Sequence, residues 1–202
     1  MLLFIWGSNM IRELVLEEKD LKCFKRIIRK NKKNNNLRIL FKYNGKLYDK
    51  PDRKLEEYNK YLEVIEVFNI KDRRERISYI YDYLCNYFDE DMRKNNYCEF
   101  ENGTCIANRL GYSVHDKNGC CYIIKKGLCK YLTDKGCSNP NPSCKIYMCA
   151  YLNNVKKVPN YDTKKIFLTS CLFSFREHEF FKRHYFITKR EYIDKYLEKI
   201  KV

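Results

Sequence analysis

Hydrophobic residues recur at helical spacing through much of the chain. This spacing predicts helices over four stretches: residues 11–30, 52–68, 72–88 and 188–200. Asp72 and Glu75 stand three residues apart, as the two members of a capping box do, which marks a helix start. Thr188 and Glu191 repeat this spacing before the last helix. Residues 164–185 are strongly apolar and aromatic, and they fit either a helix or a strand followed by a helix.

Residues 37–48 follow a different pattern, with apolar and aromatic arms on either side of Asn44-Gly45. An Asn-Gly pair accommodates the two positive φ angles of a tight two-residue turn, so this stretch is predicted to be a β-hairpin. Asp52 follows at a position suited to cap the next helix. The pattern therefore predicts a mainly α fold with one small β-hairpin.

The hydrophobic pattern stops between residues 98 and 149, where turn-forming residues and cysteines collect. Eight of the 11 cysteines lie here: Cys98, Cys105, Cys120, Cys121, Cys129, Cys137, Cys144 and Cys149. Metal binding would supply the missing order, because the free energy of binding at such sites is free energy of folding. We expect an irregular cysteine-rich metal-binding insert (97–151) between helical regions (1–96 and 152–202), with the last region packed on the first as one compact unit.

The compartment of the protein decides whether its cysteines bind metal or form disulfides, because disulfides persist only under oxidising conditions. Residues 1–6 are apolar but shorter than the hydrophobic part of a signal peptide, and no basic residue precedes them. No stretch approaches the roughly 18 uncharged apolar residues that a membrane span needs. We therefore expect a cytoplasmic protein without a membrane span, in which reduced thiols bind metal rather than pair as disulfides.

The cysteine spacing indicates thiolate ligands more firmly than it identifies the metal. Structural zinc sites commonly contain C-x2-C pairs and bacterial ferredoxins a C-x2-C-x2-C-x3-C run, and the chain has neither. Eight thiolates suffice for two four-ligand sites, or for one site and a redox or disulfide pair. Because Cys120 and Cys121 are adjacent, their side chains point in different directions, so each can serve a different site. An iron–sulfur cluster is favoured, and zinc is the alternative.

A longer pattern surrounds the double cysteine. Gly119-Cys120-Cys121 is followed by Cys129-Lys-Tyr131-Leu132, Gly136-Cys137, Asn141-Pro142, Cys144 with Tyr147, and Cys149. This order of cysteine, aromatic, leucine, glycine and proline resembles the CxxCxxCC-type cysteine-cluster family, the YkgJ-type proteins, over about residues 98–150. That family is described as a zinc- or iron-chelating domain. The resemblance implies metal-ligand roles for Cys120, Cys121, Cys129, Cys137 and Cys144.

The chain is basic, with 41 Lys and Arg against 26 Asp and Glu and a formal charge of +15. Such a charge suits nucleic acid or an anionic membrane surface. Lys, Asn, Ile and Tyr are abundant together, however, as an AT-rich coding sequence would produce. Two tetrathiolate sites of about −2 each would also lower the charge to roughly +11. The basic and aromatic run Phe180–Phe186 is typical of single-strand binders, but rings in the core with basic residues at the surface explain it more simply.

The other cysteines and the histidines have simple explanations. Cys85 lies beside the apolar side of its predicted helix, and Cys23 is isolated from the other thiols, so we interpret both as packed residues. His115 lies within the cysteine stretch and is an alternative ligand, although a surface loop histidine is the simpler interpretation. Cys171 and His178 would share a face on one continuous helix, as a nucleophile and its base could. We interpret them instead as unrelated packed side chains.

The leading hypothesis is a cytosolic metal-binding protein that holds an iron–sulfur cluster, or zinc, on clustered thiolates, with a redox, metal-handling or reaction-supporting role. One alternative is a zinc-stabilised basic nucleic-acid-binding protein. A second is an iron–sulfur-dependent protein-modifying enzyme, because related cysteine clusters occur in proteins resembling flagellin lysine methylases. The sequence contains no glycine-rich nucleotide loop and no C-x3-C-x2-C radical motif, so it assigns no catalytic residue.

Overall fold

The computed structural model describes residues 11–102, 104–110, 123–124, 127–128, 131–133 and 136–200. The described residues are mainly helical with a small sheet, which confirms the predicted mainly α class. Within the described ranges, no helix has both the length and the apolar character that crossing a membrane requires.

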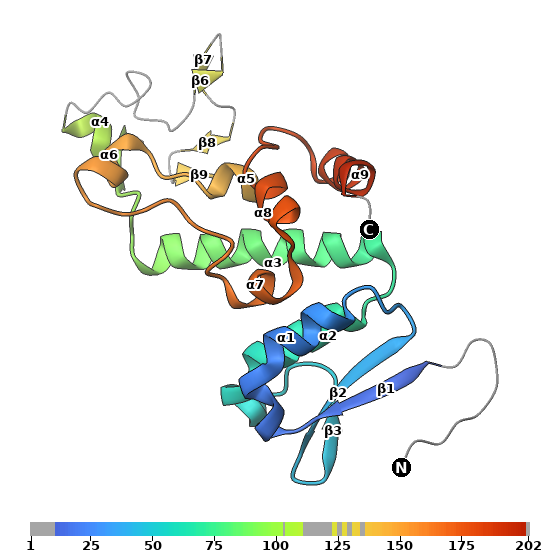
Figure 1. Cartoon of the computed structure of the whole chain (residues 1–202). Helices are drawn as coiled ribbons and strands as arrows, with labels where there is room; N and C mark the ends of the chain where they lie inside the picture. Colours follow the sequence, from blue (N-terminus) through green and yellow to red (C-terminus); the bar gives the residue numbers. More distant parts are fainter. Residues whose placement is uncertain are drawn as a thin grey trace.

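A three-stranded sheet lies at one end of the fold (Figure 1). β1 (Arg12–Leu16) pairs in parallel with β2 (Leu37–Tyr43), and β2 forms an antiparallel hairpin with β3 (Lys46–Tyr48). The hairpin prediction is confirmed, since Asn44 and Gly45 have the positive φ angles that its turn requires, 47° and 76°.

The predicted helix over residues 11–30 is wrong in its first half. β1 takes its backbone hydrogen bonds from β2, a partner more than twenty residues away that local periodicity does not register. A 3-10 helix, η1 (Glu18–Cys23), follows β1. Only α1 (Phe24–Asn31) is α-helical, and its cations face outward from two buried apolar residues.

Side-chain caps begin the remaining long helices as predicted. They are Asp52 before η2 (Arg53–Tyr58) and α2 (Asn59–Asn69), Asp72 before α3 (Arg73–Lys94), and the Thr188–Glu191 capping box before α9 (Lys189–Lys199). The predicted helix over residues 72–88 is too short, because α3 continues to Lys94. Tertiary contacts stabilise these additional turns, because Asp89 pairs with Lys145 and Met92 packs against buried residues such as Cys149 and Leu152.

The apolar stretch at residues 164–185 contains two short helices and no strand among its described residues. These are α7 (Phe167–Leu172) and α8 (Phe175–Phe181), separated where the Ser174–Glu177 capping box begins α8. Phe180 and Phe181 are 4% and 0% exposed, which agrees with the core interpretation of this run.

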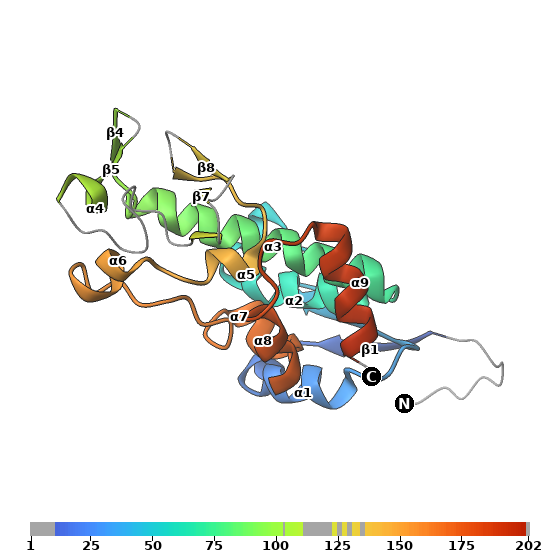
Figure 2. The ribbon, with the colours of Figure 1, turned by 90° about the horizontal axis from the view of Figure 1, so that it is seen from above.

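One large apolar cluster, the main core, joins the N-terminal and C-terminal parts of the chain. Its largest fully buried side chains include Tyr81, Tyr192, Phe24, Phe41, Phe88 and Phe181. α2 packs on β2 and α7, while α3 packs on α9 and on α5 (Pro142–Lys145), as Figures 1 and 2 show. The division of the chain at residues 97 and 152 stays a prediction.

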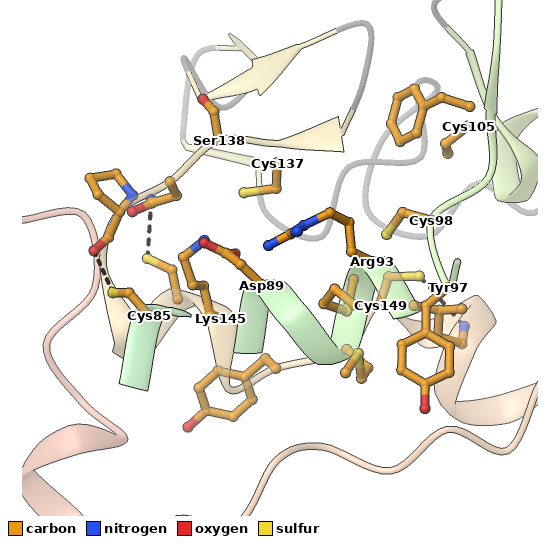
Figure 3. Close-up of a pocket in the computed structure, with 18 of the residues that line it drawn as sticks. Cys85, Asp89, Arg93, Tyr97, Cys98, Cys105, Cys137, Ser138, Lys145 and Cys149 are labelled. Atoms are coloured by element: carbon orange, nitrogen blue, oxygen red, sulfur yellow. Dashed lines mark hydrogen bonds and ion pairs between the residues drawn. The ribbon is translucent and has the colours of Figure 1, made fainter. Parts of the chain in front are cut away.

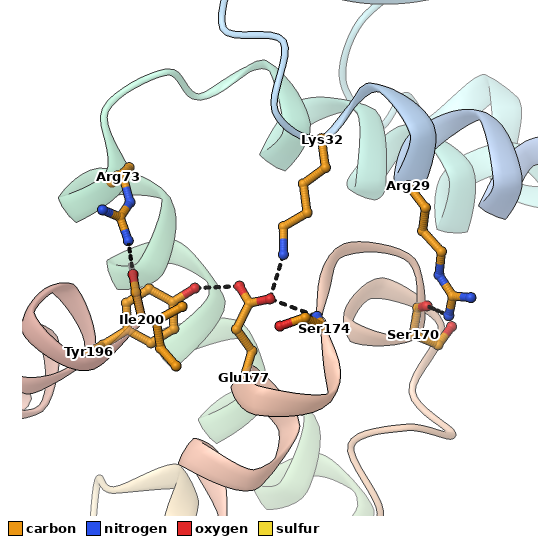
Figure 4. A network of polar contacts seen from close by, with 8 residues as sticks. All are labelled: Arg29, Lys32, Arg73, Ser170, Ser174, Glu177, Tyr196 and Ile200. Carbon is orange, nitrogen blue, oxygen red and sulfur yellow. Dashed lines mark hydrogen bonds and ion pairs between the residues drawn. The ribbon is translucent and has the colours of Figure 1, made fainter. Parts of the chain in front are cut away.

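A buried carboxylate connects helices on both sides of the main core (Figure 4). Glu177 of α8 is 4% exposed and accepts hydrogen bonds from the Ser174 N–H at 2.6 Å and the Tyr196 hydroxyl at 2.5 Å. Lys32, just after α1, forms an ion pair with the same carboxylate. Burial by itself would raise the pKa of Glu177, but the Lys32 ammonium and these hydrogen bonds outweigh it and lower that pKa from its ordinary 4.5.

The described part of the cysteine stretch consists of very short elements. They are β4 (Phe100–Glu101), β5 (Thr104–Cys105), α4 (Ile106–Arg109), β6 (Ile123–Ile124), β7 (Gly127–Leu128), β8 (Leu132–Thr133), β9 (Gly136–Cys137), α5 and α6 (Ala150–Asn154). A second apolar cluster lies among them, with six buried residues: Cys105, Ala107, Met148, Cys149, Tyr151 and Leu152. The described part of the stretch is therefore made of short, separate elements, and the metal-binding insert as a whole stays a prediction.

Candidate functional site

A cavity of about 940 Å³ lies between the C-terminal half of α3 and the segment from Cys137 to Leu152 (Figure 3). α3 contributes Cys85, Asp89 and Arg93 to one wall. The opposite wall comes from β9, α5 and the start of α6, so the cavity joins segments that are far apart in the sequence.

Five of the eight predicted ligands line this one cavity: Cys98, Cys105, Cys137, Cys144 and Cys149. The other three predicted ligands (Cys120, Cys121 and Cys129) and the alternative ligand His115 lie outside the described residues. The isolated cysteines Cys23 and Cys171 do not line the cavity.

The cavity cysteines lie in two groups. Cys98, Cys105 and Cys149 belong to the second apolar cluster, whereas Cys137 and Cys144 do not. Figure 3 shows the Arg93 side chain reaching from α3 between Cys137 and Cys98. Across the described residues, no three Cys, His, Asp or Glu side chains converge closely enough to hold one ion. The metal-binding nature of the insert therefore stays a prediction.

Cys144 is held in place by a buried asparagine turn. Asn139, 1% exposed, accepts the Asn141 N–H on its side-chain oxygen at 2.8 Å and directs its amide N–H toward Cys144 Sγ at 3.3 Å. Asn141 in turn accepts the Ser143 N–H at 2.9 Å and begins α5. Since an amide N–H can only donate, the Cys144 sulfur is positioned as an acceptor, the role that a thiolate ligand fills.

Cys149 has a similar environment. Its sulfur caps α6 and accepts the Leu152 N–H at 3.5 Å. Since a backbone N–H can only donate, the Cys149 sulfur is positioned as an acceptor, like that of Cys144.

Cys85 is the opposite case. Its thiol donates a hydrogen bond to the Pro140 carbonyl oxygen at 2.8 Å. Burial raises the pKa of Cys85 to about 12, an effect that nearby Lys145 only partly offsets. Cys85 therefore remains a protonated thiol at neutral pH, in agreement with its interpretation as a packed residue.

Tyr81 supplies a donor that is not used within the described protein. Its side chain lines the cavity and is 2% exposed, and its hydroxyl has no hydrogen-bond partner among the described residues. Burial raises the pKa of Tyr81, and the neighbouring sulfurs of Cys85 and Cys144 add to this effect. A buried unpaired hydroxyl is costly, and this one lies enclosed within the wall and is not exposed to the interior of the cavity.

Three cations border the same space. Lys145 pairs with Asp89, Lys189 pairs with Asp82 at 2.6 Å, and the exposed Arg93 reaches into the middle of the cavity wall. Positive charge near thiols favours their thiolate form. The wall is therefore suited to an anionic group bound by sulfur.

Sequence reasoning missed Tyr81 and Asn139 as site residues. Tyr81 belongs to the main core and also lines the cavity, a second role that the helical periodicity of α3 does not indicate. Asn139 could have been found from the Asn-Pro-Asn-Pro-Ser-Cys run, in which asparagines suited to turns and caps directly precede a cysteine.

Cys171 and His178 do not form a reactive pair on one helix. Cys171 is on α7 and fully buried, and His178 is on α8. His178 Nδ1 lies 2.8 Å from Thr163 Oγ1, and burial lowers the histidine's pKa. Both side chains belong to the packed interior.

No family model, curated protein or solved structure matches the chain. The resemblance to the cysteine-cluster family stays a hypothesis that depends on the order and spacing of its residues.

Proposed function

We propose that the cysteine-lined cavity binds a thiolate metal centre and that this centre is an iron–sulfur cluster. The observation that carries the proposal is the convergence of Cys98, Cys105, Cys137, Cys144 and Cys149 on one cavity from β5, β9, α5 and neighbouring segments. Cys120, Cys121 and Cys129 are the further predicted ligands from the same stretch of sequence.

The size of the cavity supports a cluster over a single zinc ion. The ligands of a structural zinc site close around the metal in a tetrahedron with Zn–S distances of about 2.3 Å, and leave little space. A cavity of about 940 Å³ is instead near the upper end of the range for small-molecule and cofactor sites. A group wider than one ion suits it better.

The polar groups of the wall fit such a centre. Asn139 and the Leu152 N–H donate to the sulfurs of Cys144 and Cys149. Hydrogen bonds to cluster sulfurs and nearby cations are the means by which proteins adjust the reduction potential of a cluster. A bound cluster would supply electron transfer, or support a reaction whose substrate the sequence does not name. Reduced thiols require a reducing compartment, so we place the protein in the cytoplasm.

The proposal is tested by measuring iron, zinc and acid-labile sulfide per chain in protein purified without oxygen. We expect about four irons with about four sulfides for each cluster bound. Replacing Cys137, Cys144 or Cys149 with Ser should lower both contents, because each replacement removes a ligand.

Cys23→Ser is the matched control, since Cys23 lies outside the cavity and should not change metal content. Zinc without sulfide would favour the zinc-stabilised alternative. A chain without metal and with paired thiols, or equal metal loss in the control, would contradict the proposal.

A further inference from the structure

A basic groove runs along α1 and shares no lining residue with the cysteine cavity. It consists of two shallow hollows of about 900 and 510 Å³ that meet at Arg29, and we call it the α1 groove. The cations of the first hollow are Lys22, Lys25, Arg26, Arg29 and Lys30, and the second adds Lys32 and Lys164. No carboxylate is among the described residues that line either hollow.

The charge of this groove is largely uncompensated. Among its seven cations, Lys32 alone forms an ion pair with a carboxylate in the described parts of the chain. Elsewhere the lysines and arginines are mixed with acids, as in the pairs Arg74–Asp194 and Lys189–Asp82. A general lysine excess would leave acids among the bases, so this groove is more than a consequence of composition.

Aromatic rings alternate with the cations. Lys25 Nζ lies 5.3 Å from the centre of the Phe167 ring, and Lys60 Nζ lies 5.1 Å from that of Tyr61. At the second hollow, Phe175 is 69% exposed, with Lys164 Nζ 5.1 Å from its ring centre. An exposed ring beside cations is the combination with which proteins bind single strands, since bases stack on rings while cations contact phosphates.

The groove is also firmly built. The Arg29 guanidinium donates to the Ser170 carbonyl oxygen at 2.7 Å, which fixes it between α1 and α7 (Figure 4). α1 itself packs on α7, so Arg29, which lines both hollows, is held where they meet. Cations held in place lose less conformational entropy when a ligand binds.

We propose that the α1 groove binds single-stranded nucleic acid, with its cations on successive phosphates and Phe175 stacked on a base. This proposal is independent of the metal centre, because the two sites share no residue. Either can fail without the other.

The test is fluorescence anisotropy of a labelled oligo(dT) of about 15 nucleotides, a length in the range that single-strand sites cover. Affinity should fall steeply between about 50 and 200 mM salt. The variant Lys22→Gln/Lys25→Gln/Lys30→Gln should weaken binding at least tenfold. It should also reduce the slope of log affinity against log salt by about 2, since each lost phosphate contact removes about 0.7. Phe175→Ala should weaken binding about fivefold or more.

The matched control is Lys46→Gln/Lys50→Gln/Lys54→Gln, which removes the same charge from exposed lysines near the hairpin. It should leave the affinity within about twofold if the groove is the site. Equal losses in the two triple variants would overturn the proposal, because binding would then follow net charge alone. Absence of oligo(dT) binding would also overturn the proposal. Vesicles of phosphatidylglycerol test the alternative that the groove binds an anionic membrane surface, and binding to them without binding to oligo(dT) would favour that alternative.

Discussion

The main core and the cysteine cavity lie on the same helix but are organised by different forces. The side of α3 that carries Ile77, Ile80 and Leu84 is buried in a large apolar cluster that extends from the sheet to α9. Farther along, the helix borders the cavity with Cys85, Asp89 and Arg93. One helix therefore supports a region that apolar burial can stabilise and a region that it cannot.

The difference follows from the amount of apolar surface available to each region. The second apolar cluster contains six buried residues, and two of these are cysteines. Its strands are each two residues long, so their ladders contribute few hydrogen bonds. Hydrophobic stabilisation is proportional to buried area, and a small cluster needs another source of stability. A thiolate metal centre would supply it.

The largest expected effect comes from removing a ring from the main core. Phe181 is 0% exposed and packs 4.9 Å from Phe173 and 5.3 Å from Tyr192, measured between ring centres. Phe181→Ala should lower the free energy of unfolding by about 3–5 kcal/mol, measured by urea denaturation. Phe175→Ala on the same helix should change it by about 0.5 kcal/mol or less, because Phe175 is 69% exposed. Similar losses in both variants would refute the assignment of the core.

The Glu177 network should show the next largest effect. Glu177→Gln should lower the free energy of unfolding by about 2 kcal/mol at neutral pH, because a charged hydrogen-bonding group is lost. Glu179→Gln on the same helix is the control, and it should lower the free energy of unfolding much less, since that carboxylate belongs to partly exposed ion pairs.

The stabilisation by Glu177 should depend on pH in a definite direction. The pKa of Glu177 is lower in the folded protein than its ordinary 4.5, so its contribution is complete above pH 4.5 and is lost as pH falls through the folded-state pKa. The stability difference between wild type and Glu177→Gln should therefore shrink on acidification, in urea denaturation repeated over pH. A difference that grows instead would show that the pKa shift has the opposite direction.

A smaller effect is expected from the hydrogen bond to the Cys144 sulfur. Asn139→Asp keeps the oxygen that accepts the Asn141 N–H but replaces the amide that donates to the sulfur. Metal affinity, measured by chelator competition, should fall about 10–100-fold while the main core keeps its stability. Ser138→Ala is the control from the same turn, because its hydroxyl bonds the Tyr131 carbonyl oxygen instead of a sulfur. If both variants lost metal equally, the N–H···S contact would have no special role.

The smallest effect is expected at Cys85. Cys85→Ser preserves a donor for the Pro140 carbonyl oxygen, so metal content should be unchanged and stability should change by about 1 kcal/mol or less. In the wild type, a pKa of about 12 should make Cys85 slow to react with iodoacetamide at neutral pH, as followed by mass spectrometry of the labelled peptides. Rapid labelling of Cys85, or metal loss in the variant, would place this thiol among the ligands.

Local signals account for the parts of the fold that could be predicted. The turn at Asn44-Gly45, the Asp72 cap and the Thr188–Glu191 box each depend on residues within four positions of one another. The helix predicted for residues 12–16 was wrong because these residues form a strand whose partner, β2, begins at Leu37. Such a long-range pairing overrides local periodicity. The predicted end of α3 was wrong for the same reason, since Asp89 pairs with Lys145, a residue of α5 that is distant in the sequence.

The sequence by itself determined the helical class, the hairpin, the caps and the crowding of cysteines into one stretch, because these follow from neighbouring residues. Tertiary structure alone decided that five of those cysteines share a cavity, that Tyr81 lines it as well, and that α1 presents cations to a groove. Such convergence depends on how α3 packs against segments more than forty residues away. That packing minimises the exposed apolar surface of the whole chain, a property that no local pattern contains.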